Sequence, residues 1–337
     1  MTKATIITVI GSLNYDLVTF TKRVPEAGET FQADAFENHL GGKGLNEALA
    51  SARLSSGNTA SIRMIGNVGN DAFGKELKQS LVDAGVDTSF VKTLENKSSG
   101  VAVILVEEES GENRILITAG ANGELKPTDS DYEEYFPKRT EAINEYLILQ
   151  NEYPDTLNTI NWIKSNRPHI NIAYNPSPFN PEFITSNVLS KIDLFIVNEG
   201  EALDVASHIL KDTEYQQFKD TIAENAKEGF KSLAVKLQSL VNQDNIKTVV
   251  ITMGSRGAVY VSKELETPEY EPSKKVTHVI DTTGAGDTFF GGVVSAMAQE
   301  KSIVEAVKFA TTASSLAIQK KGAAESIPQF EEVLKAL

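Results

Sequence analysis

The sequence of 337 residues contains no cysteine, so neither a disulfide framework nor a thiolate metal site can form. This absence is typical of proteins in a reducing compartment, and we expect a cytosolic location. Long apolar runs are missing as well. The N-terminal run "ATIITVI" is too short to span a membrane, and no small-residue cleavage site follows it. The sequence therefore predicts neither a signal peptide nor a membrane partner.

Positive charge is scarce: 32 Lys and Arg stand against 46 Asp and Glu, which gives a net charge of -14. Affinity for nucleic acid comes from clustered Lys and Arg, so we expect no nucleic-acid partner. An anionic ligand would need a locally positive pocket. The 41% of hydrophobic residues are enough for a large buried core.

Short β-branched runs alternate with segments of helical spacing along most of the chain. Runs such as "ATIITVIG", "EYLILQN" and "KTVVITMG" are typical of buried parallel strands, and residues 44–56, 71–85 and 156–166 have the spacing and length of helices. This alternation predicts an α/β fold with three layers around a doubly wound, mostly parallel sheet. No repeat or linker divides the chain, so we expect one domain over residues 1–337.

Two regions break the alternation. Residues 15–40 and 98–119 contain successive strand-like pieces with no helix between them, and residues 109–112 are expected to form a hairpin turn. We interpret both regions as one small separate β-sheet. Because they leave and rejoin the main domain near its strand ends, where open α/β sheets bind ligands, this sheet is a candidate lid.

Residues 211–242 are rich in charge and have helical spacing. We expect a helical pair on the surface, and the simplest interpretation is a solvated helical face. No role in a binding site is assigned to this segment.

Polar side chains follow the first predicted strands. The stretch "GSLNYD" supplies Asn14 and Asp16, which can hydrogen-bond hydroxyl groups, and Glu152 follows "EYLILQN". The stretch "GGKGLN" has glycines that allow close backbone approach, with Lys43 and Asn46 as further donors. It lacks the Gly-Lys-Ser/Thr of a P-loop. The alternative is the simple start of a helix with an exposed lysine, and the stretch alone does not decide between them.

The stretch "DTTGAGDTFFGG", residues 281–292, joins a glycine-rich turn to an apolar helix. The first N–H groups of a helix are unpaired and, with the helix dipole, suit a phosphate oxygen. Asp287 then either takes a proton from a group that attacks this phosphate or is merely a helix-start carboxylate. The spacing does not fit the G-x-G-x-x-G of dinucleotide-binding proteins, which disfavours an oxidoreductase.

Two further stretches follow predicted strands. Asn198 and Glu201 in "VNEGEA" are one helical turn apart, so both can face a hydrated magnesium ion, or they form a helix cap with an acidic first turn. The stretch "TMGSRG", residues 252–257, contains a "GSRG" that by itself is a common tight turn.

Together and in this order, "GSLNYD", "GGKGLN", "VNEGEA", "TMGSRG" and "DTTGAGDTFFGG" closely resemble the ribokinase (PfkB-type) family of carbohydrate kinases. The resemblance covers about residues 6–328. It implies phosphorylation of D-ribose at O5 by ATP with magnesium, with Asp287 as the base that receives the hydroxyl proton. The anion hole for the γ-phosphate is implied at Gly284, Ala285, Gly286 and Asp287.

The same resemblance implies the remaining contacts. Those with the sugar are Asn14, Asp16, Gly42, Lys43, Asn46, Glu152 and Asp287. Those with the nucleotide are Asn198, Thr252, Gly254, Ser255, Arg256, Gly257, Gly286, Asp287 and Thr311, while Asn198 and Glu201 hold magnesium through water.

A monovalent cation, potassium, is implied beside the anion hole, where the stretch "QKKGAAES" resembles the second loop of the family's cation site. The implied ligands, mostly through backbone carbonyls, are Asp281, Thr283, Ala317, Lys320, Gly322 and Ser326. The alternative is an Asp281 that only caps its turn. We also expect a homodimer through the lid, because an exposed sheet has edges and an apolar face that favour pairing.

Two rival functions remain at this point. One is another kinase of the same family, acting on a nucleoside, a fructose derivative or deoxyribose; a nucleoside site would need an apolar cradle for its base, whereas this set is Asn, Asp, Lys and Glu. The other is a noncatalytic protein that binds sugar or senses nucleotide, which the intact base and anion hole disfavour.

Overall fold

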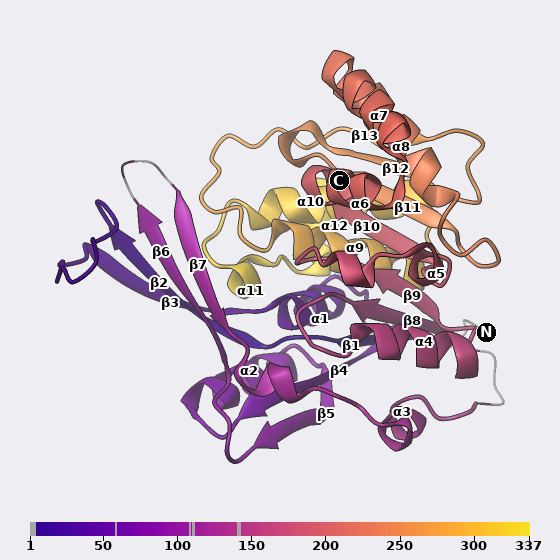
Figure 1. Cartoon of the computed structure of the whole chain (residues 1–337). Helices are drawn as coiled ribbons and strands as arrows, with labels where there is room; N and C mark the ends of the chain where they lie inside the picture. The colour runs from indigo at the N-terminus through magenta and orange to yellow at the C-terminus, as the bar shows by residue number, and fades with distance from the viewer. Residues whose placement is uncertain (1–4, 58, 108, 110–111, 140–142) are drawn as a thin grey trace.

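A computed structural model of the chain describes residues 5–57, 59–107, 109, 112–139 and 143–337. Its large sheet has the order β13-β12-β11-β10-β9-β8-β1-β4-β5 (Figure 1). From β5 to β11 all neighbours pair parallel, and β12 and β13 extend one edge antiparallel. The strands are β1 (Thr5–Ile10), β4 (Ala60–Gly69), β5 (Asp87–Leu94), β8 (Asn144–Leu149), β9 (Asn171–Tyr174), β10 (Leu194–Asn198), β11 (Thr248–Thr252), β12 (Ala258–Val261) and β13 (Glu269–Glu271).

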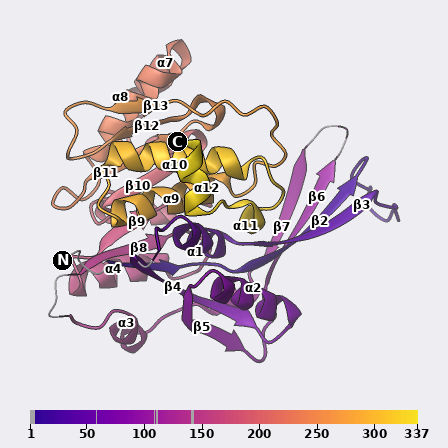
Figure 2. The ribbon, with the colours of Figure 1, turned by 180° about the vertical axis from the view of Figure 1, so that it is seen from behind.

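Helices cover both faces of this sheet, which explains the continuous apolar strands. In β1, Ile7 and Val9 pack into the core under one helix layer, and Ile10 packs into the core under the other. The first layer, seen in Figure 2, contains α1 (Lys43–Arg53), α2 (Ala72–Asp83), α9 (Ala285–Ala298), α10 (Ile303–Ala317) and α12 (Phe330–Ala336). The second contains α3 (Asp129–Tyr135), α4 (Thr156–Asn166), α5 (Ser186–Leu189), α6 (Glu199–Ile209) and α8 (Ala226–Gln238). The predicted three-layer α/β fold is confirmed.

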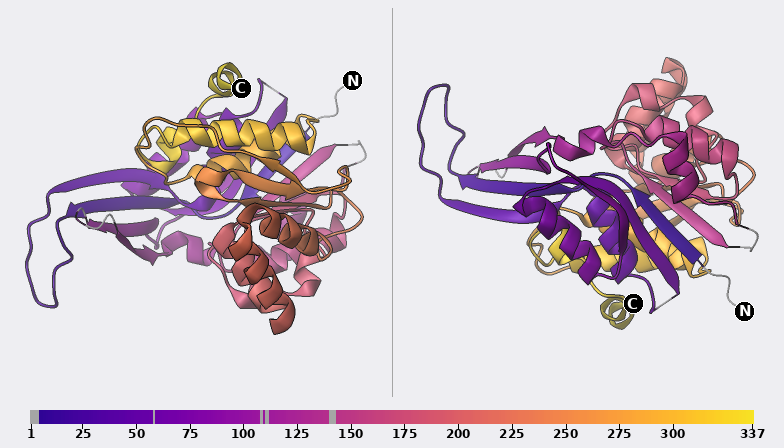
Figure 3. Two further views of the ribbon diagram at one scale, coloured as in Figure 1. Left: turned by 90° about the horizontal axis from the view of Figure 1, so that it is seen from above. Right: turned by 90° about the horizontal axis from the view of Figure 1, so that it is seen from below.

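A second sheet projects from one edge of this body, as the two views of Figure 3 show. It has the order β3-β2-β6-β7, with β2 (Asn14–Thr21), β3 (Ala35–Gly41), β6 (Gly100–Glu107) and β7 (Asn113–Thr118). The separate small sheet is therefore confirmed. Its action as a lid stays a prediction, and the hairpin turn expected at residues 109–112 lies largely outside the described residues.

The charged segment 211–242 forms two helices that differ in burial. Helix α7 (Asp212–Glu224) has no buried residue and stands out at the top of Figure 1, as a solvated face would. Helix α8 differs from that expectation, because Phe230, Leu233 and Leu237 are buried in the second core. Their spacing of three and four residues places them on one helical face. Among the residues that the structure describes, no helix is both long and apolar enough to cross a membrane.

Candidate active site

Residues from four parts of the chain meet at the carboxyl ends of β1 and β8. The backbone N–H of Lys43 donates to Glu152 Oε2 over 2.9 Å, and the Ser12 hydroxyl donates to the same carboxylate oxygen. Asn46 Nδ2 donates to Asp287 Oδ2 over 2.8 Å, and Lys43 Nζ lies 3.4 Å from Asp287 Oδ1. The loop after β1, the first turn of α1, the loop after β8 and the start of α9 therefore form one polar cluster.

Asp287 lies in the first turn of α9, but it is not the cap of that helix. The N-cap is Gly284, whose φ of 72° is a left-handed conformation that glycine adopts without strain. The Asp287 side chain, 12% exposed, faces Lys43 and Asn46 instead. Asp287 is therefore a first-turn carboxylate of α9 that also faces two donors, and its role as a base stays a prediction. The backbone of Gly284, Ala285 and Gly286 precedes it at the N-terminus of a 14-residue helix, the position expected of an anion hole.

Lys43 is the cation of this cluster. Its burial works against the charge, but the carboxylates of Asp287, Glu152 and Glu47 outweigh that effect and raise the pKa of the ammonium above its ordinary value. Its side chain is 25% exposed, so Lys43 is partly buried, in contrast to the exposed lysine of the alternative interpretation. The site thus offers one cationic group to an anionic ligand, set among several carboxylates.

Asp16 lies on β2, at the root of the small sheet. Burial and the neighbouring charge of Glu152 raise the pKa of Asp16 to about 7. A Cβ at Gly41 would come within 2.3 Å of Asp16 Oδ2, so a side chain there would displace the Asp16 carboxylate. Gly42, with φ of 88°, is the N-cap of α1, and a Cβ there would lie 2.8 Å from the backbone N of Asn14. Both predicted sugar residues of β2 thus adjoin the glycine turn.

Asn198 and Glu201 form a reciprocal capping box at the start of α6. Asn198 Oδ1 accepts from the Glu201 N–H over 2.9 Å, and Glu201 Oε2 accepts from the Asn198 N–H over 2.9 Å. Asn175 Nδ2 donates to the same Oε2. The helix-cap alternative describes this geometry. Among the described residues, no three His, Asp or Glu side chains converge on a metal position, so magnesium here would need water or phosphate oxygens.

The predicted nucleotide residues extend along the neighbouring strand. Thr252 at the end of β11 pairs with Asn198 at the end of β10. A 3-10 turn follows at Gly254–Arg256, where the Arg256 guanidinium donates to Glu199, and Gly257 ends the turn with φ of 94°. The structure thus groups Asn198, Thr252, Gly254, Ser255, Arg256 and Gly257 at one end of the sheet. Thr311 is buried in α10, and within the described chain its Oγ1 has no hydrogen-bond partner.

Asp281 connects the two loops of the predicted cation site. Its Oδ1 accepts from the Thr283 N–H and hydroxyl, as a turn cap would, and its Oδ2 accepts from the Gly322 N–H over 3.0 Å. Burial disfavours its charge, but these hydrogen bonds hold the pKa of Asp281 below its ordinary value.

A Cβ at Gly284 would lie 2.8 Å from Ala323, so the second loop packs directly on the anion-hole turn. Ala317 and Ser326 are buried nearby, whereas the Lys320 side chain points away to Glu332.

Three residues of the site were missed in the sequence. Ser12 stands inside the quoted "GSLNYD" and binds Glu152. Glu47 of α1 is 1% exposed and accepts from Gln150, a residue at the end of β8 that is fully buried. Burial and the charge of Asp287 raise the pKa of Glu47 well above its ordinary value. The one available signal for Glu47 was its place directly after Asn46 in the glycine-lysine stretch.

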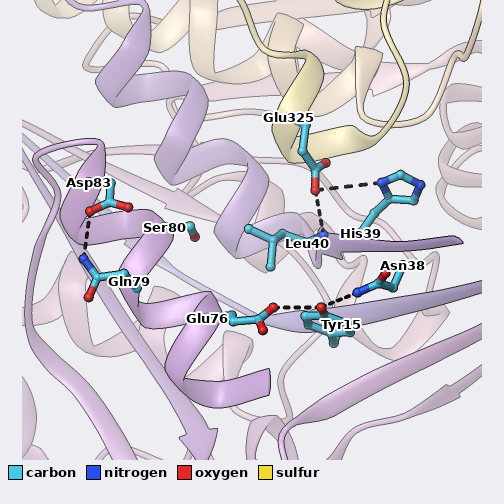
Figure 4. A pocket seen from close by; sticks show the side chains of 9 residues that line it. All are labelled: Tyr15, Asn38, His39, Leu40, Glu76, Gln79, Ser80, Asp83 and Glu325. Atoms are coloured by element: carbon cyan, nitrogen blue, oxygen red, sulfur yellow. Dashed lines mark hydrogen bonds and ion pairs between the residues drawn. The ribbon is translucent and has the colours of Figure 1, made fainter. Parts of the chain in front are cut away.

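A cavity of about 370 Å³ lies beside this site, at the root of the small sheet (Figure 4). Tyr15 points into it, away from the face of β2 that carries Asp16, and donates to Glu76 over 2.8 Å. Glu325 of α11 (Ala323–Ser326) accepts from the Leu40 N–H of β3 over 3.1 Å and approaches His39. The cavity has no lining residue in common with the predicted sugar set. It marks the junction of the small sheet with α2 and α11.

Comparison with known proteins supports a kinase site. Residues 4–329 match the pfkB family of carbohydrate kinases. A ribokinase of Schizosaccharomyces pombe is 37% identical over 97% of this chain and 96% of that protein, and one of Haemophilus influenzae is 33% identical over 98% of both. The chain therefore belongs to the pfkB family of carbohydrate kinases.

Solved structures agree with this assignment. A ribokinase from Arabidopsis thaliana, complexed with ribose and ATP, matches with a TM-score of 0.80 and 29% identity over 99% of this chain and 98% of that one. A Cryptococcus neoformans ribokinase in complex with ADP matches with a TM-score of 0.78 and 28% identity over 99% and 100%. Within the family, this chain is a ribokinase-type, ATP-dependent sugar kinase.

Proposed function

We propose that this enzyme transfers the γ-phosphoryl group of ATP to O5 of D-ribose, giving D-ribose 5-phosphate and ADP. The observation that carries this proposal is Asp287. It is a largely buried carboxylate at the N-terminus of α9, beside Lys43 and Asn46 and directly after the glycine turn. The similar ribokinases, one of them complexed with ribose and ATP, support ribose as the sugar.

In the proposed reaction, the 5-hydroxyl oxygen of ribose attacks the γ-phosphorus in line. The new O5–P bond forms as the bond to the β-phosphate oxygen breaks, and the hydroxyl proton passes to the Asp287 carboxylate. The N–H groups of Gly284, Gly286 and Asp287 at this helix start would stabilise the charge that develops on the γ-phosphate oxygens. The Ala285 N–H donates to Thr282 O over 3.3 Å and would have to leave that partner to join them. Asn46 and Lys43 hold the Asp287 carboxylate in place. Closure of the small sheet over the sugar would exclude water.

The proposal includes a magnesium ion held through water by Asn198 and Glu201. Glu201 Oε2 is taken by two N–H donors, but among the described residues no donor reaches its Oε1, which is therefore available to a metal-bound water. When bound, magnesium would neutralise charge on the phosphate oxygens of ATP. The nucleotide itself would lie along Thr252 and the turn at Gly254–Arg256, continuing to Gly257 and Thr311.

A potassium ion belongs to the same proposal, between the loop of Asp281 and Thr283 and the loop of residues 317–326. Support comes from the hydrogen bond between Asp281 and Gly322 and from the contact of Gly284 with Ala323. Oxygen ligands suit such a hard cation, and carbonyl dipoles can replace its hydration shell. Ala317, Lys320, Gly322 and Ser326 would contribute mainly backbone carbonyls.

The substitution Asp287→Asn tests the role of the base. Amide nitrogen cannot accept the proton, so kcat should fall by about 10²–10⁴-fold while ribose still binds. A residue that only stabilised the helix start would instead cost roughly 1 kcal/mol of folding free energy and leave turnover intact. Steady-state kinetics and a thermal melt of the same preparation separate the two results. Near-normal turnover in the variant would remove Asp287 from the mechanism.

We also propose a homodimer formed through the small sheet. Register places Ile115 and Ile117 of β7 on the face that carries Asp16, because Asp16 pairs with Ala102 and Ala102 with Ile117. Ile115 and Ile117 are 50% and 60% exposed. A second copy of the chain would cover this apolar face.

A further inference from the structure

Asn122 has no place in the site described so far, yet it is buried beside Asn14. It lies in the 3-10 turn η1 (Gly120–Glu124), which leads the chain from β7 back to the main body. Its amide makes three hydrogen bonds: Oδ1 accepts from the Leu13 N–H over 3.0 Å, and Nδ2 donates to Leu13 O over 3.0 Å and to Asn14 Oδ1 over 2.8 Å. Asn122 is 1% exposed and Asn14 is 5% exposed.

The backbone of Leu13 decides which way the Asn122 amide points. A backbone N–H can only donate and a carbonyl can only accept, so Oδ1 must face the Leu13 N–H and Nδ2 must face Leu13 O. The second hydrogen of Nδ2 then needs an acceptor, which the oxygen of Asn14 supplies. The orientation of the Asn14 amide is thus set by the chain itself, without any ligand.

This arrangement leaves the Nδ2 group of Asn14 available. In the part of the chain that the structure describes, Nδ2 of Asn14 donates to no protein group, although the residue is buried. Asn14 and Asp16 are two positions apart on β2 and so share a face of the strand. On that face lies the sugar cluster, because Gly42 packs against the backbone of Asn14 and Asp16 is electrostatically coupled to Glu152 and Asp287.

Gly100 of β6 leaves space for the contact between the Asn14 and Asn122 amides. A Cβ at Gly100 of β6 would lie 2.2 Å from both Asn122 Nδ2 and Asn14 Oδ1, so a side chain there would separate the two amides. The η1 turn is itself held to the body, since Asn67 Nδ2 donates to Ala121 O over 3.2 Å and the Ala121 N–H donates to Ser98 O over 2.8 Å. Asn122 is therefore anchored independently of Asn14.

We propose that Asn122 is a positioning residue that holds the Asn14 amide with its Nδ2 toward the sugar, so that Asn14 recognises a sugar oxygen as a hydrogen-bond acceptor. Asp16 and Glu152, as carboxylates, accept hydrogen bonds from sugar hydroxyls. The Asn14 Nδ2 group adds a hydrogen-bond donor. A site with both donors and acceptors distinguishes the orientation of sugar hydroxyls as well as their presence. The inference rests on the proposed sugar site.

A double-mutant cycle tests this role by steady-state kinetics with ribose and ATP. A buried hydrogen bond to substrate is worth about tenfold or more in affinity, so Asn14→Ala should raise the KM for ribose by that factor. Asn122→Ala should raise the same KM and leave the KM for ATP unchanged. Because Asn122 acts through Asn14, the double variant should be no worse than Asn14→Ala alone.

Two further variants separate positioning from general loosening of the turn. Asn122→Asp keeps the size but replaces the donor by an acceptor, so the Asn14 amide turns round and the KM for ribose rises again; this variant carries the test if Asn122→Ala does not fold. Asn67→Ala, the matched control, removes a hydrogen bond to the same turn without touching Asn14, and its KM for ribose should stay at the unmutated value.

Distinct results would overturn distinct claims. The positioning role would be overturned if the rise of the KM for ribose in the double variant were the product of the two single rises. It would also be overturned if Asn122→Ala raised the KM for ATP as much as the KM for ribose. An unchanged KM for ribose in Asn14→Ala would overturn it as well, while leaving ribose phosphorylation intact. Absence of ribose turnover in the unmutated enzyme would overturn the proposed function itself and the inference with it.

Discussion

Asp16 is a carboxylate whose environment opposes its charge. Burial and the charge of Glu152 raise its pKa to about 7, so in the free enzyme a large part of the Asp16 population is protonated at neutral pH. As a carboxylate, Asp16 can accept hydrogen bonds from two sugar hydroxyls, whereas the protonated form loses acceptor capacity. Ribose binding should therefore favour ionised Asp16.

The KM for ribose should rise as the pH falls through about 7, because a proton must leave Asp16 before the sugar binds. Asp16→Asn should bind ribose weakly at every pH and lose this dependence, while the KM for ATP stays the same. The pH range to measure extends about one unit on either side of that pKa, from about pH 6 to about pH 8. A KM for ribose that stays constant over this range in the unmutated enzyme would contradict the assignment.

The raised pKa of Asp16 also makes the stability of the fold depend on pH, in the opposite direction to ribose binding. The pKa of Asp16 in the folded state lies above its ordinary value, so the folded chain binds more protons than the unfolded chain between these two values. The contribution of Asp16 to stability is present at low pH and lost as the pH rises through about 7. Residues chosen for binding often oppose stability in this way.

Single residues of the site differ in how far the sequence reveals them. Lys43, Asn46 and Asp287 could be predicted because each stands in a stretch whose glycines and helix start indicate anion binding. Glu47 could not, since an acidic residue on a helix ordinarily faces water. Its burial depends on α9, where Gly291 lacks a side chain and lets that helix approach the Glu47 backbone. That contact joins segments about 240 positions apart, which local pattern does not show.

At the scale of elements, the alternating buried strands and helices were predictable, whereas the antiparallel edge of the large sheet was not. Helix α4 begins and ends at the predicted residues 156 and 166. Strands β12 and β13 have four and three residues, too few to show a period, and the sequence predicts neither the pairing of β12 with β11 nor that of β13 with β12. The charges of helix α8 mask an apolar face that becomes evident only against the sheet, so the sequence predicts a solvated helix.

The two loops around Asp281 give the element-scale prediction. A cation that joins these loops would order the anion-hole turn, since Ala323 of one loop packs on Gly284 of the other. The rate at saturating ribose and ATP should rise strongly with potassium and less with sodium at equal ionic strength. Asp281→Ala should abolish this response. Equal rates in potassium and in tetramethylammonium, a cation too bulky for the loops, would leave Asp281 only the turn-capping role.

At the scale of the whole molecule, the exposed face of the small sheet gives a prediction about assembly. Light scattering at micromolar concentration should give the mass of a dimer. Ile115→Lys combined with Ile117→Lys should shift it to a monomer, because charge would have to be buried in the interface. Leu116→Lys is the matched control: Leu116 is 69% exposed on the opposite face of the same strand, and the dimer should persist. A monomeric unmutated enzyme would refute the proposed assembly.

The central claim is that this fold and site phosphorylate ribose. The most direct measurement compares ATP consumption and the phosphorylated product with ribose, deoxyribose, fructose and adenosine, each with magnesium and potassium present. The account predicts the highest kcat/KM for ribose and ribose 5-phosphate as the product. It predicts little turnover of adenosine, because the described side chains of the sugar cluster, such as Asn46 and Glu152, are polar, whereas a base would need an apolar cradle. A higher kcat/KM for another of these substrates, or ribose binding without ATP consumption, would contradict the account.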